Sequence, residues 1–241
     1  MKRRLIILLL STCIFSCNEE QTPDITTGLT ANIALDGSAE DLVSSATGTI
    51  HDATAAPNRL GEIGKSMQFN AVDSSYIDFG DLDGVSFTGN QFTISCWLLA
   101  IDTARRMAVL SKRTPAGPFE YSFDNHFYLS FFTLDNWVSS GAGTVYGIDP
   151  LKASASIEAG TWQHIAFVAD GEFLKAYVDG VLQYGVDARI SGMSFSNTTA
   201  PFIIGAGGAF GVNHFFNGCI DDIRIYNKAL NAEAIRFLAD S

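Results

Sequence analysis

The sequence predicts an all-β fold of antiparallel strands that ends in a short helix. Two observations point to this class. Three β-prone runs in the last third of the chain are separated by Asp-Gly pairs, which form the tight turns of hairpins. The composition, with 18 Phe and 22 Gly among 241 residues, also suits a β-rich core with many turns.

The three β-prone runs span residues 162–169, 173–178 and 181–184. An Asp-Gly pair at 170–171 separates the first two, and a second pair at 179–180 separates the last two. Strands joined by such short turns lie side by side and run antiparallel. We therefore predict a three-stranded meander.

A strand is predicted at 220–226. Side chains alternate between the two faces of a strand, so Asp221, Ile223 and Ile225 are expected to share one face. The two isoleucines indicate that this face is turned toward the core. A carboxylate placed there needs a hydrogen-bond network, a cation or a metal to compensate its lost hydration. Asp221 is therefore the first candidate functional residue.

The last predicted element is a helix at 232–239. Asn231 precedes it and is a residue type that caps helix N-termini. Ile235 and Leu238 are three residues apart, which places them on one side of the helix. We expect this side to face inward.

Four segments resemble those of a known family. SMQFNAVDSSYIDFG is similar to the family's strand, bulge and strand near the start, and QFTISCWLLA to its long core strand. WQHIAFVADGEFLKAYVDGVL is similar to its central meander, and FFNGCIDDIRIYNKALNAEAI to its closing strand and helix. In this order they resemble the laminin-G-like, pentraxin-related members of the concanavalin A-like lectin/glucanase superfamily.

The resemblance extends over residues 28–239. It implies an antiparallel jelly-roll sandwich of two sheets with a short C-terminal helix. This fold hosts lectins, adhesion modules, hydrolases and spacers, so it predicts the architecture far more sharply than the function.

The N-terminus predicts export. Residues 1–4 are basic and 5–10 are apolar, a stretch too short for a permanent membrane span but typical of a secretory signal. It ends at Ile-Phe-Ser followed by Cys17, which resembles the lipobox of bacterial lipoproteins. We expect a signal peptide at 1–16, an acylated Cys17 with a flexible tether at 17–27, and one domain at 28–241. The alternative is an ordinary signal peptide that is cleaved elsewhere.

The tether begins with Asn-Glu-Glu at 18–20, which resembles the surface-export signal of Bacteroidetes lipoproteins. We therefore expect the domain to be held at the outer membrane, on the cell surface, through its lipid anchor. Loss of the three basic residues of the signal peptide takes the net charge from −11 to −14. Such acidity argues against nucleic acid or anionic lipid as a partner.

The resemblance also implies a structural calcium ion that joins the first strand to the last. In the family the carboxylate that opens the closing strand is a typical ligand, and here that residue is Asp221. The matching ligand after the first strand would be Asp36, with Asp41 as a further candidate. Calcium takes six to eight oxygen ligands, so backbone carbonyls would complete the shell. The alternative is that Asp36 caps a turn and Asp221 bonds to backbone amides.

The sequence contains no arrangement typical of catalysis. Sandwich glycanases of the laminarinase type use a Glu-x-Asp-x-x-Glu motif on one strand, and no two glutamates here have that arrangement. The four histidines lack zinc-site spacing, and no Gly-x-Ser-x-Gly elbow is present. His164, Trp97 and Trp162 fall within the segments that carry the resemblance and are expected to be structural. We therefore expect a protein that is not an enzyme.

Sugar recognition needs exposed aromatic faces and planar polar groups. The segment 105–150 departs most from the family pattern, and it contains Trp137 flanked by Asp135 and Asn136. These three residues are the predicted ligand-binding site, with Tyr146 as a secondary candidate. The alternative is that Trp137 folds back over an edge of the sandwich.

These features favour a surface-anchored, non-catalytic carbohydrate-binding or adhesion lipoprotein, with a glycan or polysaccharide as its partner. A structural or protein-interaction subunit of a cell-surface assembly is the alternative, and a divergent glycoside hydrolase comes third. After anchoring, Cys96 and Cys219 are the two cysteines that remain. The sequence leaves open whether they form a disulfide or stay as thiols.

Overall fold

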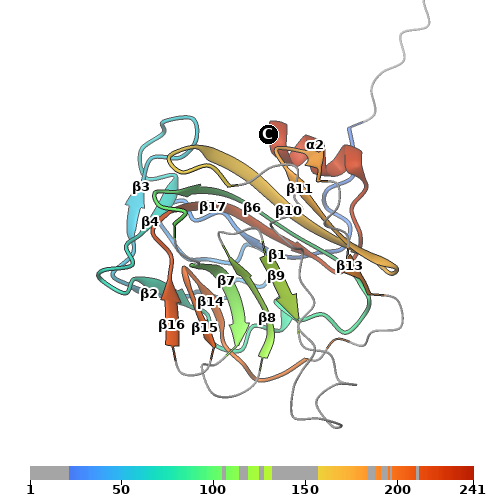
Figure 1. The fold of residues 1–241 in the computed structure, drawn as a ribbon, viewed down its shortest axis with the longest axis horizontal. Helices are drawn as coiled ribbons and strands as arrows, with labels where there is room; N and C mark the ends of the chain where they lie inside the picture. The colour runs from blue at the N-terminus through green and yellow to red at the C-terminus, as the bar shows by residue number, and fades with distance from the viewer. Residues whose placement is uncertain are drawn as a thin grey trace, which may run out of the picture.

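Two antiparallel β-sheets pack face to face, and one helix lies on the outer face of the larger sheet (Figure 1). The structure is a computed structural model that describes residues 22–104, 107–113, 119–124, 128–131, 157–183, 188–190, 195, 197–209 and 212–241. This confirms the predicted class, an antiparallel two-sheet sandwich with a short C-terminal helix.

The elements of the described residues are, in chain order, β1 (Leu29–Ile33), β2 (Thr49–His51), β3 (Thr54–Ala56), β4 (Ser66–Phe69), β5 (Tyr76–Asp78), the 3-10 helix η1 (Asp83–Val85), β6 (Gln91–Ala100), β7 (Ala108–Arg113), β8 (Phe119–Asp124), β9 (Tyr128–Phe131), β10 (Trp162–Asp170), β11 (Phe173–Val178), β12 (Val181–Leu182), β13 (Ala188–Arg189), β14 (Phe202–Ile204), β15 (Ala206–Ala209), β16 (Val212–Phe215), β17 (Gly218–Tyr226) and α2 (Ala232–Asp240).

Within the described residues, the larger sheet has nine strands in the order β12-β11-β10-β6-β17-β4-β3, with β1 added to β17 and β13 to β11. The smaller sheet has six strands in the order β2-β5-β14-β7-β8-β9, and β15 pairs with β16 in a separate ribbon. The first strand therefore pairs with the last, which closes the chain on itself in the larger sheet.

The predicted meander is present as β10, β11 and β12. Its second turn has positive φ angles at both central residues, 49° at Asp179 and 74° at Gly180. This is the combination that a tight hairpin turn requires. The third strand is shorter than predicted, because β12 covers only Val181–Leu182.

The core lies between the two sheets. Phe167 of the larger sheet and Phe123 of the smaller sheet are both buried, and their ring centres are 4.9 Å apart in an edge-to-face arrangement. Phe92 is fully buried on β6. Burial of this aromatic surface is the main force that holds the sheets together.

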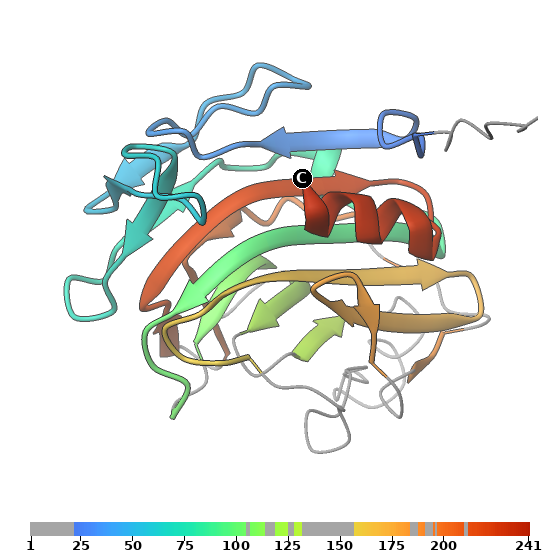
Figure 2. The same ribbon diagram turned by 90° about the horizontal axis from the view of Figure 1, so that it is seen from above.

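The helix α2 follows the predicted pattern. The Asn231 side chain accepts a hydrogen bond from the Ala234 amide at 2.8 Å, which satisfies one of the free donors of the first turn. Ile235 and Leu238 are fully buried. They pack on the outer face of the larger sheet and not in the central core, as Figure 2 shows by the position of α2 in front of that sheet.

Cys96 and Cys219 are both free. Cys96 belongs to the core cluster between the sheets. Cys219 is paired in register with Leu99, whose neighbours Leu98 and Ala100 point into the core. The two thiols therefore lie on opposite faces of the larger sheet.

Candidate functional site

A β-bulge in β17 determines where Asp221 points. Asp221 pairs with Trp97 of β6, whereas Arg224 pairs with Ser95, so β17 has one more residue than β6 between these two pairs. The extra residue is accommodated at Asp222, whose φ of 49° lies in the left-handed region that few non-glycine residues adopt.

The bulge changes which side chains share a face. Ile223 and Ile225 are fully buried in the core between the sheets, as predicted. Asp221 lies on the opposite, outer face across from Trp97, so the prediction that it shares the core face with these isoleucines is wrong. Strict alternation fails here because the additional residue of the bulge shifts the pattern by one position.

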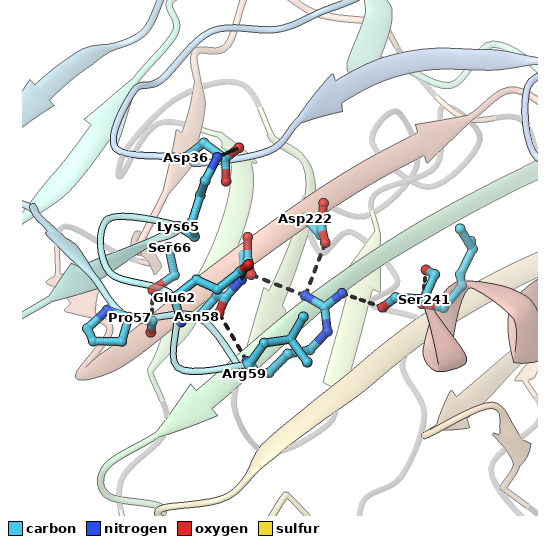
Figure 3. A network of polar contacts seen from close by, with 12 residues as sticks. Asp36, Pro57, Asn58, Arg59, Glu62, Lys65, Ser66, Asp222 and Ser241 are labelled. Carbon is cyan, nitrogen blue, oxygen red and sulfur yellow. Dashed lines mark hydrogen bonds and ion pairs between the residues drawn. The ribbon is translucent and has the colours of Figure 1, made fainter.

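Arg59 supplies the charge that compensates Asp221. It lies in the loop between β3 and β4, and its Nη1 is 3.3 Å from Asp221 Oδ2 and 3.2 Å from Asp222 Oδ2. Its Nη2 donates to the backbone carbonyl of Ser241, and its guanidinium carbon lies 4.6 Å from the centre of the Trp97 ring. Figure 3 shows this side chain between the closing strand and the end of α2.

The Asp221 carboxyl is only 2% exposed. Burial, reinforced by the charge of Asp222, raises its pKa to about 7, while Arg59 acts in the opposite direction. The charge of Asp36 acts in the same direction as that of Asp222. Asp221 therefore titrates close to neutral pH.

Two more polar side chains lie on this outer face, His164, which is buried, and Trp97, which is half-buried. His164 of β10 pairs with Trp97, and the two ring centres are 5.5 Å apart. Trp97 Nε1 and His164 Nδ1 have no hydrogen-bond partner among the described residues. Burial, followed by the charges of Arg224 and Arg59, lowers the pKa of His164 to about 3, which keeps its imidazole neutral. We call Arg59, Asp221, Asp222, Trp97 and His164 the closing-strand cluster.

Asp36 is held by a lysine of the protein. Lys65 Nζ lies 2.8 Å from Asp36 Oδ2, and both residues are labelled in Figure 3. The hydrogen bond to Asp36 is the largest cause of the raised pKa of Lys65. Lys65 and Arg59 therefore face the two carboxylates expected to bind calcium. The part of the chain that the structure describes contains no group of three or more His, Cys, Asp or Glu placed to hold a metal ion.

Asp41 has a different role from Asp36 and Asp221. Its carboxylate is fully buried and accepts hydrogen bonds from the amides of Asn32 at 2.8 Å, Val43 at 3.2 Å and Ser44 at 3.1 Å. It organises the loop after β1. With Asp41 used in this way and cations at Asp36 and Asp221, the donor set in its present arrangement does not fit calcium, which needs six to eight oxygen ligands. The calcium ion is thus implied by the family resemblance alone.

The other predicted functional residues, Trp137, Asn136, Asp135, Tyr146 and Cys17, lie outside the described residues. Arg59 was not identified from the sequence. No local pattern marks it, because the ion pair joins positions that are 162 residues apart. The sequence indicated only that a buried Asp221 needs a compensating group such as a cation. It did not indicate which residue supplies the positive charge.

Comparisons with solved structures show the same fold. Domain 4 of a GH43 extracellular arabinanase from Geobacillus stearothermophilus, solved with arabinotriose, is 22% identical with a TM-score of 0.61, and the match covers 88% of this chain and 98% of that domain. The binding domain of Paraclostridial Mosquitocidal Protein 1 is 16% identical with a TM-score of 0.60, over 88% of this chain and 52% of the other.

A sialidase from Trypanosoma rangeli is 16% identical with a TM-score of 0.57, over 90% of this chain. This chain spans about half of the mosquitocidal structure and only 33% of the sialidase. A comparison with curated proteins finds no match. Within the described residues, no helix has the length and apolar character needed to cross a membrane.

The family model described as the concanavalin A-like lectin/glucanases superfamily, in its laminin G group, matches residues 70–236. This range begins just after β4 and runs through β17 into α2, so it includes most strands of each sheet and four of the five residues of the closing-strand cluster. The chain belongs to the laminin G group of the concanavalin A-like lectin/glucanases superfamily.

Proposed function

We propose that this chain is a non-catalytic carbohydrate-binding or adhesion module. The observation that carries the proposal is the match to the arabinanase domain, which was solved with arabinotriose. It covers 88% of this chain and 98% of that domain, so the two have nearly the same extent. The sialidase, solved with a sugar-like ligand, carries a domain of the same fold within a longer chain. Modules of this fold thus occur in proteins that handle glycans.

The carboxyl groups support a binding role over a hydrolytic one. Glycosidases generally place two carboxyl groups about 5–10 Å apart on either side of the scissile bond. Burial raises the pKa of both Asp221 and Glu120, but Asp221 lies on β17 of the larger sheet and Glu120 on β8 of the smaller one. Each is already paired with a cation, Asp221 with Arg59 and Glu120 with Lys112 at 3.6 Å.

The test is a screen of the full chain on a broad glycan and polysaccharide array, first with calcium and then with chelator. We expect saturable binding to one glycan class. A blank array under both conditions, with the chain still folded by its melting transition, would refute the carbohydrate-binding role.

A role in binding another protein is the second candidate. The loop between β3 and β4 exposes Leu60 to 72% and Ile63 to 89%. Two large apolar side chains on one exposed loop suit contact with a protein surface better than contact with a sugar. The blank array described above would favour this role.

We also propose that the chain is displayed on the cell surface through a lipid at Cys17. The basic and apolar N-terminal residues and the lipobox-like Ser-Cys at 16–17 support this. We expect Cys17→Ser to move the protein from the membrane fraction to the soluble fraction. A variant that stays in the membrane fraction would contradict the anchor.

A further inference from the structure

Three aromatic side chains form a row at one end of the smaller sheet. His51 of β2 and Tyr76 of β5 are direct cross-strand partners, and their rings stack with centres 4.3 Å apart and an interplanar angle of 14°. Phe215 of β16 extends the row, with its ring centre 6.3 Å from that of Tyr76. Figure 1 shows β2 and β16 at the same end of the molecule. We call these three residues the aromatic row.

The aromatic row points away from the core. Ile77, the neighbour of Tyr76 on β5, is fully buried between the sheets, so alternation turns Tyr76 to the outer face. All three rings of the row are half-buried. The core packing therefore does not account for three neighbouring aromatic rings on this side of the sheet.

The polar atoms of the aromatic row have no hydrogen-bond partner among the described residues. This holds for the His51 imidazole and for the Tyr76 hydroxyl. Neither group is fully shielded from solvent. Asp78 lies two residues beyond Tyr76 on the same face. One oxygen of Asp78 accepts from the Gly80 amide at 2.7 Å, and the other has no partner among the described side chains.

This combination of groups suits a sugar. A sugar ring presents C–H groups that pack on aromatic faces, and its hydroxyls bond to polar groups beside them. The Asp78 carboxylate and the net charge of −11 disfavour acidic sugars at this position. We propose that His51, Tyr76, Phe215 and Asp78 form a binding site for a neutral glycan, an inference that rests on the proposed carbohydrate-binding function.

The test is affinity gel electrophoresis of the full chain in gels that contain arabinan, mannan or mixed-linkage β-glucan as neutral probes, and polygalacturonate or alginate as acidic ones. We expect at least one neutral polysaccharide to retard the wild-type chain. His51→Ala and Phe215→Ala should each weaken that interaction about tenfold, because each removes a ring that contacts the row on one side only and so leaves its other face for a sugar. The control Phe173→Ala removes a half-buried ring from β11 of the other sheet and should leave the interaction unchanged.

Folding of each variant is checked by its melting temperature. Asp78→Asn keeps the side-chain shape and should weaken binding several-fold even where an alanine variant does not fold. If the folded variants bind a neutral polysaccharide as well as wild type, the aromatic row is not the site, while the proposed function stands. Retardation by acidic probes alone would also overturn the neutral-glycan site and leave the function in place. No retardation by any probe would overturn the neutral-glycan site as proposed, and a blank glycan array would overturn the function with it.

Discussion

Arg59 is the residue on which the closing-strand cluster depends. It contacts two carboxylates of β17 and the carbonyl of Ser241, and it stacks on Trp97. A carboxylate that is 2% exposed, such as Asp221, loses most of its hydration and needs this positive charge when it is ionised. The guanidinium also covers the Trp97 ring, so its loss would expose apolar surface.

We therefore expect Arg59→Met to lower the free energy of unfolding by about 2 kcal/mol at pH 8, because it leaves a buried charge unpaired. Urea unfolding measures this. The matched control is Arg236→Met, which removes an exposed ion pair with Asp240 on α2 and should change the stability by less than about 0.5 kcal/mol. Equal effects of the two variants would contradict the role assigned to Arg59.

Asp221 and His164 contribute to the pH dependence of stability with opposite signs. Burial raises the pKa of Asp221 from 3.8 to about 7. Between pH 3.8 and about 7 the folded chain therefore binds more protons at this group than the unfolded chain does. The contribution of Asp221 to the free energy of unfolding falls as pH rises through this range. Burial lowers the pKa of His164 from 6.5 to about 3, so the unfolded chain holds the extra proton and this contribution rises with pH. The two contributions oppose each other between about pH 4 and 6.5.

Replacing one of the two groups should leave only the pH dependence of stability that the other contributes. Relative to wild type, Asp221→Asn should gain stability as pH rises from about 4 to 7, and His164→Gln should lose it as pH rises to about 6.5, each by at most about 1.4 kcal/mol per pH unit. Urea unfolding at a series of pH values in this range measures both slopes. Stability profiles that run parallel to wild type would show that neither group titrates as described.

At the scale of elements, the bulge in β17 is the feature that forms the cluster. Without the extra residue, alternation would put Asp221 on the core face with Ile223 and Ile225, as the sequence pattern predicts. Asp222 adopts a φ of 49° to make the bulge, and it also lies 3.3 Å from Arg224 and 3.2 Å from Arg59. Its backbone conformation and its charge both affect stability.

Two substitutions separate these effects. Asp222→Asn removes the charge but keeps a residue type that tolerates the left-handed region, so it should cost about 1 kcal/mol or less. Asp222→Val adds a β-branched side chain that this conformation disfavours and should cost about 2 kcal/mol more. Thermal unfolding compares them, and equal melting temperatures would mean that the bulge carries no backbone strain.

The elements that the sequence predicted correctly are those with local signals. Asp-Gly turns define the meander, and Asn231 marks the start of α2. A β-bulge depends on the register of two strands, so the pattern of β17 alone did not reveal it. The aromatic row has the same origin, because His51 and Tyr76 become neighbours only through the pairing of β2 with β5. Sites formed by strand register are therefore the ones that sequence patterns missed.

At the scale of the whole molecule, the first and last strands of the chain meet beside the closing-strand cluster. β1 pairs with β17, and the Asp222 amide donates to the carbonyl of Ala34, just after β1, at 3.4 Å. Asp36 follows β1 and Asp221 lies on β17, so the two carboxylates belong to the two chain segments that meet here. The family resemblance assigns calcium to join these chain segments, whereas in the structure Lys65 and Arg59 face the two carboxylates.

These alternatives differ in one measurable property. A bound calcium ion would raise the melting temperature of the full chain in millimolar calcium relative to chelator, because a ligand that binds only the folded state stabilises it by mass action. The ion pairs predict no change, since the negative charge is already compensated, and this is the outcome we expect. In the double variant Arg59→Met, Lys65→Met the carboxylates lose their cations, so calcium should raise its melting temperature by several degrees. A calcium-dependent rise in the melting temperature of wild type would instead establish the metal site. It would also show that calcium displaces Lys65 and Arg59 from the two carboxylates.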